Sequence, residues 1–438
     1  MTSRQSRVHH LQFSQLSAVR GAKKNRHFRR PIITFCLAGF SFFLWSFRMT
    51  AQDTQELPVE SLLVRGQILR ERGEFDEAIR LLNEALAKDP KLASAYHERG
   101  LAWYKKGDLD RAAADYKQAL EFNPKLAEAY NNRGIICFLK KDYSCAASDF
   151  GKAIKLKPAL AEPYLNRGNL YRITGRLDKA IEDLGKAIEQ YPKYMPGGQT
   201  ISVPNTRLAL AFFERGLACR QAERPQEAIA DYNSALEVDP GFAEAYVNRG
   251  TLLAQDGRLN DAMADYDRAV KLNPQLAGAY VNRGFVQIEM SDFRGALPDF
   301  NQAISLQPDL FQAYLNRGYA WFRLGDKRQA IQDYTKALSL EPRSYKAYLG
   351  RAIVLKDEGD FKSALADFDR STKISPPSHF VLIQRGITFM LLGMKSEAER
   401  DLKQSIRKYP NLRSYVERMV SENIRTHQAL AITPPVLR

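Results

Sequence analysis

The stretch AEAYNNRGIICFLKKDYSCAASDFGKAIKLKP, residues 127–158, decides the fold. Its apolar residues form two runs at helical spacing, and Lys141 and Asp142 stand at a turn between the runs. Pro158 ends the second run because proline cannot continue a helix. The stretch therefore predicts two amphipathic helices that pack as a hairpin.

An arginine and a proline each recur once in every such unit, with a period of 34 residues. Both series slip by the same 14 residues between the fourth and fifth units, so they mark the same ten units independently. A period of this length indicates a repeat architecture rather than two or three globular domains. The arginines are Arg65, Arg99, Arg133, Arg167, Arg215, Arg249, Arg283, Arg317, Arg351 and Arg385, and the prolines are Pro90, Pro124, Pro158, Pro192, Pro240, Pro274, Pro308, Pro342, Pro376 and Pro410.

Small residues occupy two fixed positions in the units. Glycine follows the arginine in the first helix, as at Gly100, Gly134 and Gly168, and all ten units have alanine in the second helix. Small side chains at these positions allow the two helices of a hairpin to approach closely. The alanines are Ala78, Ala112, Ala146, Ala180, Ala228, Ala262, Ala296, Ala330, Ala364 and Ala398.

This order of small and large residues resembles the tetratricopeptide repeat, in its Asn-Arg-Gly variant of bacterial type. The resemblance covers residues 59–412 and is specific for the fold. It implies an all-α protein, an α-solenoid or right-handed superhelix of about ten hairpins, whose first helices line a concave surface that binds extended or helical peptides. The residues that carry the resemblance in one unit are Tyr96, Gly100, Trp103, Ala112, Tyr116, Ala119 and Pro124.

The repeats and the segments outside them predict the organisation of the chain. An open solenoid needs a polar capping helix at its end, and the residues after Pro410 have that character. Pro196, Gly197, Gly198 and Pro204 predict a loop where the period slips. The expected parts are a basic region at 1–30, a signal or anchor segment at 31–48, a linker at 49–58, units 1–4 at 59–192, an inserted loop at 193–207, units 5–10 at 208–412, a capping helix at 413–431 and a tail at 432–438.

The net charge of +15 comes mostly from the N-terminal region. Residues 1–52 carry nine Lys or Arg and no acid, which leaves 56 of the 65 bases against 50 acids in the rest of the chain. No dense basic face interleaved with aromatic residues is present, so we do not expect binding to nucleic acid.

Residues 31–47 contain no charge and follow a basic stretch, a pattern typical of an export signal or membrane anchor. The excess of bases before this segment predicts an N-terminus in the cytoplasm and repeats outside it, in the periplasm or at the membrane. Cleavage and retention of the segment both remain open. A second interpretation is that translation starts at Met49, which would give a cytoplasmic adaptor or co-chaperone.

The arginine series is accompanied by aspartate in nine of the ten units, three residues after the alanine. We expect each arginine to lay its aliphatic stem in the hairpin interface and to reach the aspartate of its own unit, which fixes geometry more than it adds stability. The expected structural ion pairs include Arg133 with Asp149, Arg249 with Asp265, Arg283 with Asp299, and Arg317 with Asp333.

A second series places asparagine just before the arginine on the first helices of five units, whereas Glu98 and Glu214 interrupt it and units 1, 9 and 10 lack it. A side-chain amide can donate to and accept from a peptide unit at once, so this series is a candidate peptide-binding site, similar to the asparagine ladder of the O-linked N-acetylglucosamine transferase superhelix. The alternative is a tolerated polar residue. Units 6–8 are the best candidate groove, where Phe285, Ile288, Tyr319 and Phe322 follow and about half of these are expected in the core. The series is Asn132, Asn166, Asn248, Asn282 and Asn316, and the peptide-binding set adds Phe285 and Tyr319.

The sequence shows no catalytic, metal-binding or cofactor-binding motif. Cys137 and Cys219 are most simply small core residues, and a disulfide between Cys137 and Cys145 is an alternative in an exported protein. We therefore expect no enzymatic activity and no cofactor. The expected function is a protein-interaction scaffold that binds a protein or peptide partner, with its oligomeric state open.

Overall fold

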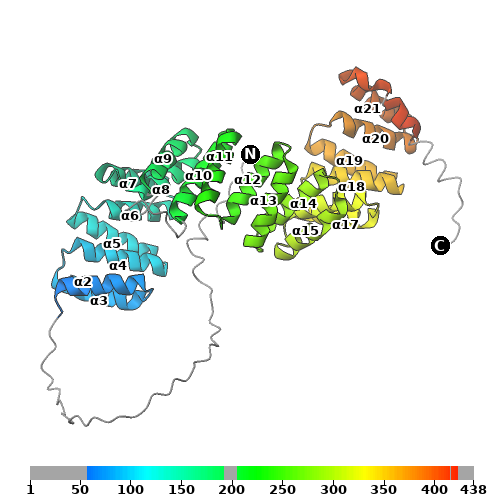
Figure 1. The fold of residues 1–438 in the computed structure, drawn as a ribbon. Helices are drawn as coiled ribbons and strands as arrows, with labels where there is room; N and C mark the ends of the chain where they lie inside the picture. The colour runs from blue at the N-terminus through cyan, green and yellow to red at the C-terminus, as the bar shows by residue number, and fades with distance from the viewer. Residues whose placement is uncertain (1–56, 192–204, 415, 423–438) are drawn as a thin grey trace, which may run out of the picture. The chain divides into compact units, whose positions relative to one another are not determined.

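The computed structural model describes residues 57–191, 205–414 and 416–422. In these residues the chain forms no strand, and twenty consecutive α-helices pair into ten hairpins, with a further helical segment after them (Figure 1). The predicted all-α repeat fold is therefore confirmed. The first helices of the hairpins are α2 (Val59–Glu71), α4 (Ala93–Lys106), α6 (Ala127–Leu139), α8 (Ala161–Ile173), α10 (Thr206–Gln221), α12 (Ala243–Gln255), α14 (Ala277–Glu289), α16 (Phe311–Arg323), α18 (Tyr345–Glu358) and α20 (His379–Leu391).

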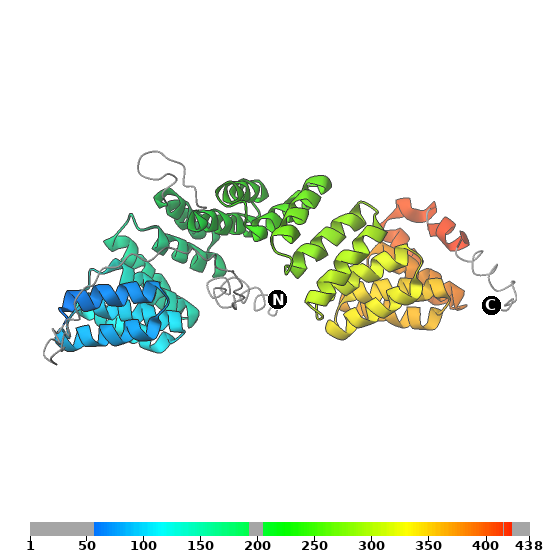
Figure 2. The same ribbon diagram turned by 60° about the horizontal axis from the view of Figure 1, so that its bottom comes forward.

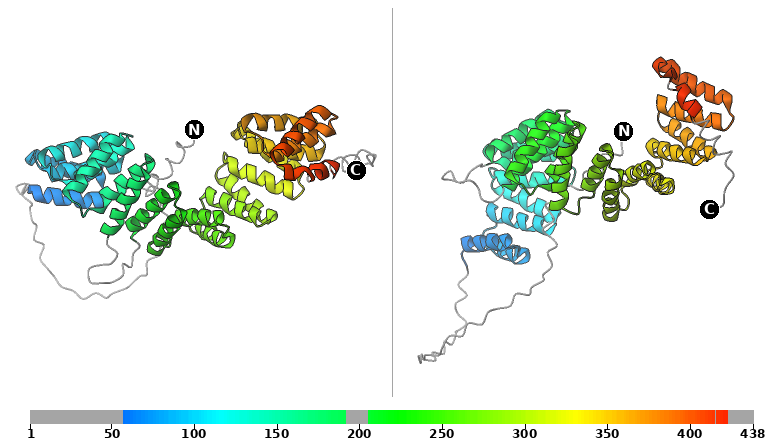
Figure 3. Two further views of the ribbon diagram at one scale, coloured as in Figure 1. Left: turned by 90° about the horizontal axis from the view of Figure 1, so that it is seen from above. Right: turned by 45° about the vertical axis from the view of Figure 1, so that its right-hand side comes forward.

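The second helices complete the hairpins, and each one before α21 also packs on the first helix of the next unit (Figure 2). Units that are adjacent in the sequence are therefore adjacent in space, as two further views show (Figure 3). The second helices are α3 (Phe75–Lys88), α5 (Leu109–Phe122), α7 (Tyr143–Leu156), α9 (Leu177–Gln190), α11 (Pro225–Val238), α13 (Leu259–Leu272), α15 (Phe293–Leu306), α17 (Lys327–Leu340), α19 (Phe361–Ile374) and α21 (Lys395–Lys408), and a 3-10 turn η2 (Pro410–Leu412) follows them.

Close approach of the two helices explains the small residues. A Cβ atom built on Gly134 would lie 2.7 Å from Cε1 of Phe150, which is too close for any side chain. Ala146, on the facing helix, is completely buried. The aromatic ring thus fills the space left by the glycine, and the same contact recurs between Gly100 and Tyr116.

The turn within every hairpin contains one residue with a left-handed backbone. Seven of these residues are glycine, which adopts a positive φ without steric cost. Lys141, Glu223 and Ser291 take the same conformation with φ of 62°, 59° and 64°. The geometry of the turn is therefore set by the repeat, and these three units carry backbone strain.

Several predicted boundaries fall outside the described residues. These are the basic region, the signal or anchor segment, residues 49–56 of the linker, residues 193–204 of the inserted loop, the end of the capping helix after residue 422 and the tail. Among the described residues, no helix combines the length and the apolar character needed to cross a bilayer.

Helix α10 begins two residues before the predicted start of unit 5 at residue 208. It begins at Thr206, because the side chain of Asn205 accepts a hydrogen bond from the backbone N–H of Leu208 and caps the helix. After η2 the chain is helical again up to residue 422 in its described part, and Val416 packs against Ile383 and Ile387 of α20.

Candidate functional site

Nine arginines on the first helices form an arginine ladder, defined here as the nine that pair with an aspartate of their own unit. Each guanidinium donates through Nε and Nη2 to both carboxylate oxygens, and the shortest N–O separations are 2.6–2.7 Å. The hydrogen bonds to Asp149 raise the pKa of Arg133 above its ordinary value. The pairs are Arg99–Asp115, Arg133–Asp149, Arg167–Asp183, Arg215–Asp231, Arg249–Asp265, Arg283–Asp299, Arg317–Asp333, Arg351–Asp367 and Arg385–Asp401.

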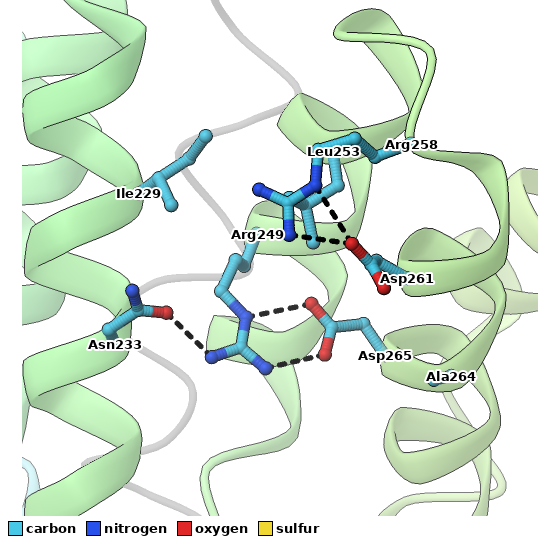
Figure 4. Close-up of a pocket in the computed structure, with 8 residues that line it drawn as sticks. All are labelled: Ile229, Asn233, Arg249, Leu253, Arg258, Asp261, Ala264 and Asp265. Atoms are coloured by element: carbon cyan, nitrogen blue, oxygen red, sulfur yellow. Dashed lines mark hydrogen bonds and ion pairs between the residues drawn. The ribbon is translucent and has the colours of Figure 1, made fainter.

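Arg249 lies in a pocket between two consecutive second helices, and we call such a place a seam. Figure 4 shows the seam between α11 and α13, a pocket of about 330 Å³. There Arg249 donates to Asp265 on one side, while its Nη1 donates to Oδ1 of Asn233 on the other side at 2.7 Å (Figure 4). One guanidinium therefore joins three helices from two units.

A further set of polar pairs connects first helices of neighbouring units. Nε of Arg172 on α8 donates to Glu214 on α10 at 2.9 Å, and the two side chains are only 4% and 5% exposed. Burial raises the pKa of the Glu214 carboxyl, and the Arg172 guanidinium opposes this shift. This pair and the packing of α9 on α10 join units 4 and 5 directly, on either side of the insertion in the sequence.

An equivalent pair joins units 1 and 2, where Nε of Arg70 donates to Oε2 of Glu98 at 2.8 Å. Burial alone would raise the pKa of Glu98, but the neighbouring His97, whose Nδ1 lies 3.7 Å from Oε1, and the hydrogen-bonded Arg70 outweigh burial, and the pKa is lowered. Glu98 and Glu214 interrupt the asparagine series because each pairs with a cation of the preceding unit. Lys356 and Gln384 make the corresponding contact between units 9 and 10 at 2.9 Å.

The asparagines of units 3 and 4 are half-buried and bind other side chains of the chain. Nδ2 of Asn132 lies 3.1 Å from Nε2 of His97, and Nδ2 of Asn166 donates to Oδ1 of Asn131 at 2.9 Å. These amides connect adjacent first helices, so part of their hydrogen-bonding capacity is already used.

The asparagines of units 6–8 differ from one another. Asn248 accepts from Nη1 of Arg220 at 2.9 Å, and Nδ2 of Asn282 lies 3.3 Å from the Thr251 hydroxyl to which it donates. Within the described residues, the Asn316 side chain makes no hydrogen bond. Asn316 is therefore the most available amide of the series. Asn282 comes second, because its carbonyl oxygen remains available.

Phe285 and Tyr319 occupy the same repeat position, three residues after Asn282 and Asn316. They are 44% and 38% exposed, whereas the other eight units bury or half-bury the residue at this position. The Tyr319 hydroxyl accepts a hydrogen bond from Nη1 of Arg323 at 2.8 Å, which orients the ring. Two neighbouring first helices thus present large apolar side chains to solvent.

The other two residues of this apolar set lie toward the core. Ile288 is buried, with 7% exposure, and Phe322 is half-buried. Residues three apart on a helix point only about 60° apart, so the difference in exposure reflects how the neighbouring helices cover each position.

The described cysteines form no metal site. Cys137 and Cys145 are joined by a disulfide between α6 and α7, so the alternative interpretation of Cys137 holds and it is not a free core thiol. Asp149 lies near the two sulfurs but is engaged by Arg133. Cys219 is buried, and burial raises the pKa of its thiol to about 11.

The second partners of the ladder arginines and the pairs between first helices were not predicted. A signal for both exists in the sequence. The second acceptor stands 16 residues before the arginine, as Asn233 does for Arg249, and the paired cation stands 28 residues before its partner, as Arg70 does for Glu98. Comparison of residue types at these two spacings across units would have revealed both sets.

Comparison with protein-family models finds matches described as the TPR repeat and the tetratricopeptide repeat. Together they span residues 66–194 and 209–344, which is more than half of the chain. A comparison with curated protein sequences finds no match. The matched segments are 66–107 and 100–141 for the TPR repeat, and 127–160, 161–194, 209–277, 277–310 and 311–344 for the tetratricopeptide repeat.

Solved structures similar to this chain include several tetratricopeptide proteins. YrrB, described as a TPR protein with an unusual peptide-binding site, is 23% identical, with 46% of this chain and 96% of that chain covered and a TM-score of 0.38. A tetratricopeptide repeat protein from Parabacteroides merdae is 22% identical, with coverage of 60% and 98% and a TM-score of 0.44. The hetero-tetramer Cut9–Hcn1 matches at 14% identity, with coverage of 84% and 83% and a TM-score of 0.46.

Proposed function

Because this chain belongs to the tetratricopeptide repeat family, we propose that it is a non-catalytic scaffold that binds a peptide segment of another protein on its first helices in units 7 and 8. The observation that carries this proposal is the exposure of Phe285 and Tyr319 at one repeat position of two neighbouring helices. Exposed aromatic side chains on neighbouring helices are typical anchors of protein interfaces.

The polar neighbours of the two aromatic rings support a neutral partner. The carbonyl of Asn282 and the amide of Asn316 can bind the backbone of an extended peptide. Four residues before these asparagines stand Gly278 and Gln312, both exposed, where units 3, 4 and 6 have glutamate. The partner segment therefore needs apolar side chains and a free backbone edge, and no basic charge.

Selection of a displayed random peptide library on the wild-type protein tests the proposal. We expect enriched peptides to bind the double variant Phe285→Ala with Tyr319→Ala at least about tenfold more weakly, since interface aromatic residues contribute about 2 kcal/mol or more. Met290→Ala is the matched control, because Met290 is 46% exposed but lies at the end of α14, outside this repeat position. Equal affinity of the double variant and the control would contradict the proposal.

For the location we propose export or membrane anchoring, with the repeats outside the cytoplasm. The support is the uncharged segment 31–47 after a basic stretch. Fractionation of the native protein with N-terminal sequencing tests this proposal. A cytoplasmic protein that begins at Met49 would contradict it and favour the adaptor alternative.

A further inference from the structure

Among the described first helices, α2 lacks a cover that all the others have. It packs on α3 and α4 (Figure 1), whereas each later first helix is also covered by the second helix of the preceding unit. Ile68 shows the difference, because it is 43% exposed and its equivalents in the nine other units are at most 4% exposed. These equivalents are Ala102, Ile136, Leu170, Ala218, Leu252, Val286, Ala320, Val354 and Thr388.

The sequence of α2 departs from the repeat on this uncovered face. Val64 is apolar and 50% exposed, where units 2–8 and 10 have Glu, Asn or Gln and unit 9 has Gly350. Val64 precedes Ile68 by four residues, so the two side chains adjoin on the helix surface, and we call them the end stripe. The outermost helix of a repeat protein normally has a polar outer face, so an apolar one indicates an interface.

Arg65, beside the end stripe, lacks the partner that the equivalent arginines have. Leu81 stands 16 residues after it, where the nine other units have the aspartate of the arginine ladder. Arg65 is exposed and makes no hydrogen bond or ion pair with any described residue. Glu77 of α3 lies close enough for a weak electrostatic effect of Arg65, but it is bound by Arg80. The guanidinium of Arg65 is therefore available to a partner.

Charged side chains of opposite sign flank the end stripe. With about 100° of rotation per residue, Glu60 and Glu71 lie about 80° and 60° to one side of Ile68. Arg65 and Arg72 lie about 60° and 40° to the other side. All four charged side chains are exposed. The face is therefore neutral overall, with an acidic flank and a basic flank.

The two flanks make the face complementary to a second copy of itself in one direction. A two-fold axis parallel to α2 brings the acidic flank of each copy against the basic flank of the other, whereas an antiparallel pair brings like flanks together. In the parallel pair, Val64 and Ile68 take the apolar positions of a two-stranded coiled coil, and Glu60 and Arg65 take the two positions that form salt bridges between the helices.

We propose that two copies of this chain associate through their end stripes as a parallel pair, in which Glu60 of each copy binds Arg65 of the other. The pair is distinct from the peptide-binding face proposed on units 7 and 8, and it joins two such faces in one assembly. A partner segment that occurs twice would then bind with higher overall affinity. Parallel pairing also places the N-terminal ends of both α2 helices on the same side, as two anchors in one membrane require.

Exchange of the two charges tests the proposal, with the full-length protein in a mild detergent and sedimentation velocity at about 0.15 M ionic strength as the readout. We expect the wild type to form a reversible dimer with a dissociation constant on the order of 10 µM, because one helix pair buries less than a standard interface. Glu60→Arg or Arg65→Glu alone puts like charges into both symmetry-related pairs and should weaken self-association at least about tenfold. The double variant Glu60→Arg with Arg65→Glu should dimerise like the wild type.

A mixture of the two single variants provides a second test. Fluorescein-labelled Glu60→Arg protein should form a mixed dimer with unlabelled Arg65→Glu protein, because both pairs then join opposite charges. Recovery in the mixture also excludes misfolding of the single variants. Ile68→Ser should abolish the dimer, whereas the control Leu156→Ser, at the end of α7 and 41% exposed in the wild type, should leave it unchanged.

A wild type that stays monomeric at about 100 µM would overturn the proposal, and the end stripe would then serve a helix of a different protein. Single variants that dimerise like the wild type would also overturn it. The same holds if the double variant and the mixture both stay monomeric, because Glu60 and Arg65 would then not pair across two copies.

Discussion

Replacement of Arg172 by alanine tests whether the buried pair with Glu214 holds units 4 and 5 together across the inserted loop. The N–O distance of the pair is 2.9 Å, and the side chains of Arg172 and Glu214 are only 4% and 5% exposed. The substitution leaves the Glu214 carboxylate buried without its counter-ion. Burial already raises the pKa of this carboxyl, so its charged form depends on Arg172.

The cost of removing one member of a buried ion pair is about 3–5 kcal/mol. Replacement of both members by apolar residues of similar volume, Arg172→Met with Glu214→Leu, is expected to be near neutral because no buried charge remains. A matched exposed pair is Lys186 with Glu182 on α9, whose side chains are 44% and 62% exposed. Lys186→Ala should cost no more than about 1 kcal/mol.

Hydrogen exchange of backbone amides measures the effect locally, since units of a repeat protein open in part independently. In Arg172→Ala, amides of α8 and α10 should lose protection by about 3–5 kcal/mol, and urea unfolding followed by circular dichroism should separate into two transitions. If Arg172→Ala resembles Lys186→Ala, or if the double apolar variant is as unstable as the single variant, the ion pair does not join the two units.

Three further substitutions have expected outcomes. Gly134→Ala should lower the free energy of unfolding by about 1–3 kcal/mol because its Cβ meets Phe150, whereas Gly151→Ala in the same hairpin, where a Cβ meets only Nη1 of Arg167 at 3.6 Å, should raise it by roughly 0.5–1 kcal/mol, as measured by urea denaturation. Ser291→Gly should stabilise the protein by roughly 0.5–1 kcal/mol, since it relieves a positive φ, and an unchanged urea midpoint would contradict this. Glu98→Gln should destabilise the protein at neutral pH, and this difference should shrink as the pH falls below about 4.3, because the lowered pKa of Glu98 gives stability that is lost on protonation. A pH-independent difference would refute the last expectation.

The sequence alone predicted the repeat, its period and the ten hairpins. Such features depend on contacts that are repeated in every unit, so each unit gives the same information. Gly134 and Ala146 could be placed in the hairpin interface because glycine and alanine at fixed spacing leave room only for a close helix pair. The partners Arg133 and Asp149 were predicted for the same reason.

Features that differ between units required the tertiary structure. Whether Asn166 is free depends on Asn131 of another helix, and whether Phe285 is exposed depends on how the neighbouring unit covers it. Arg172 and Glu214 meet across an inserted loop, and Ile68 is exposed because no described second helix covers it. The pattern within one unit determines the fold because its contacts are local, while the candidate binding surfaces arise at the junction of two units, where residues far apart in the sequence come within hydrogen-bonding distance.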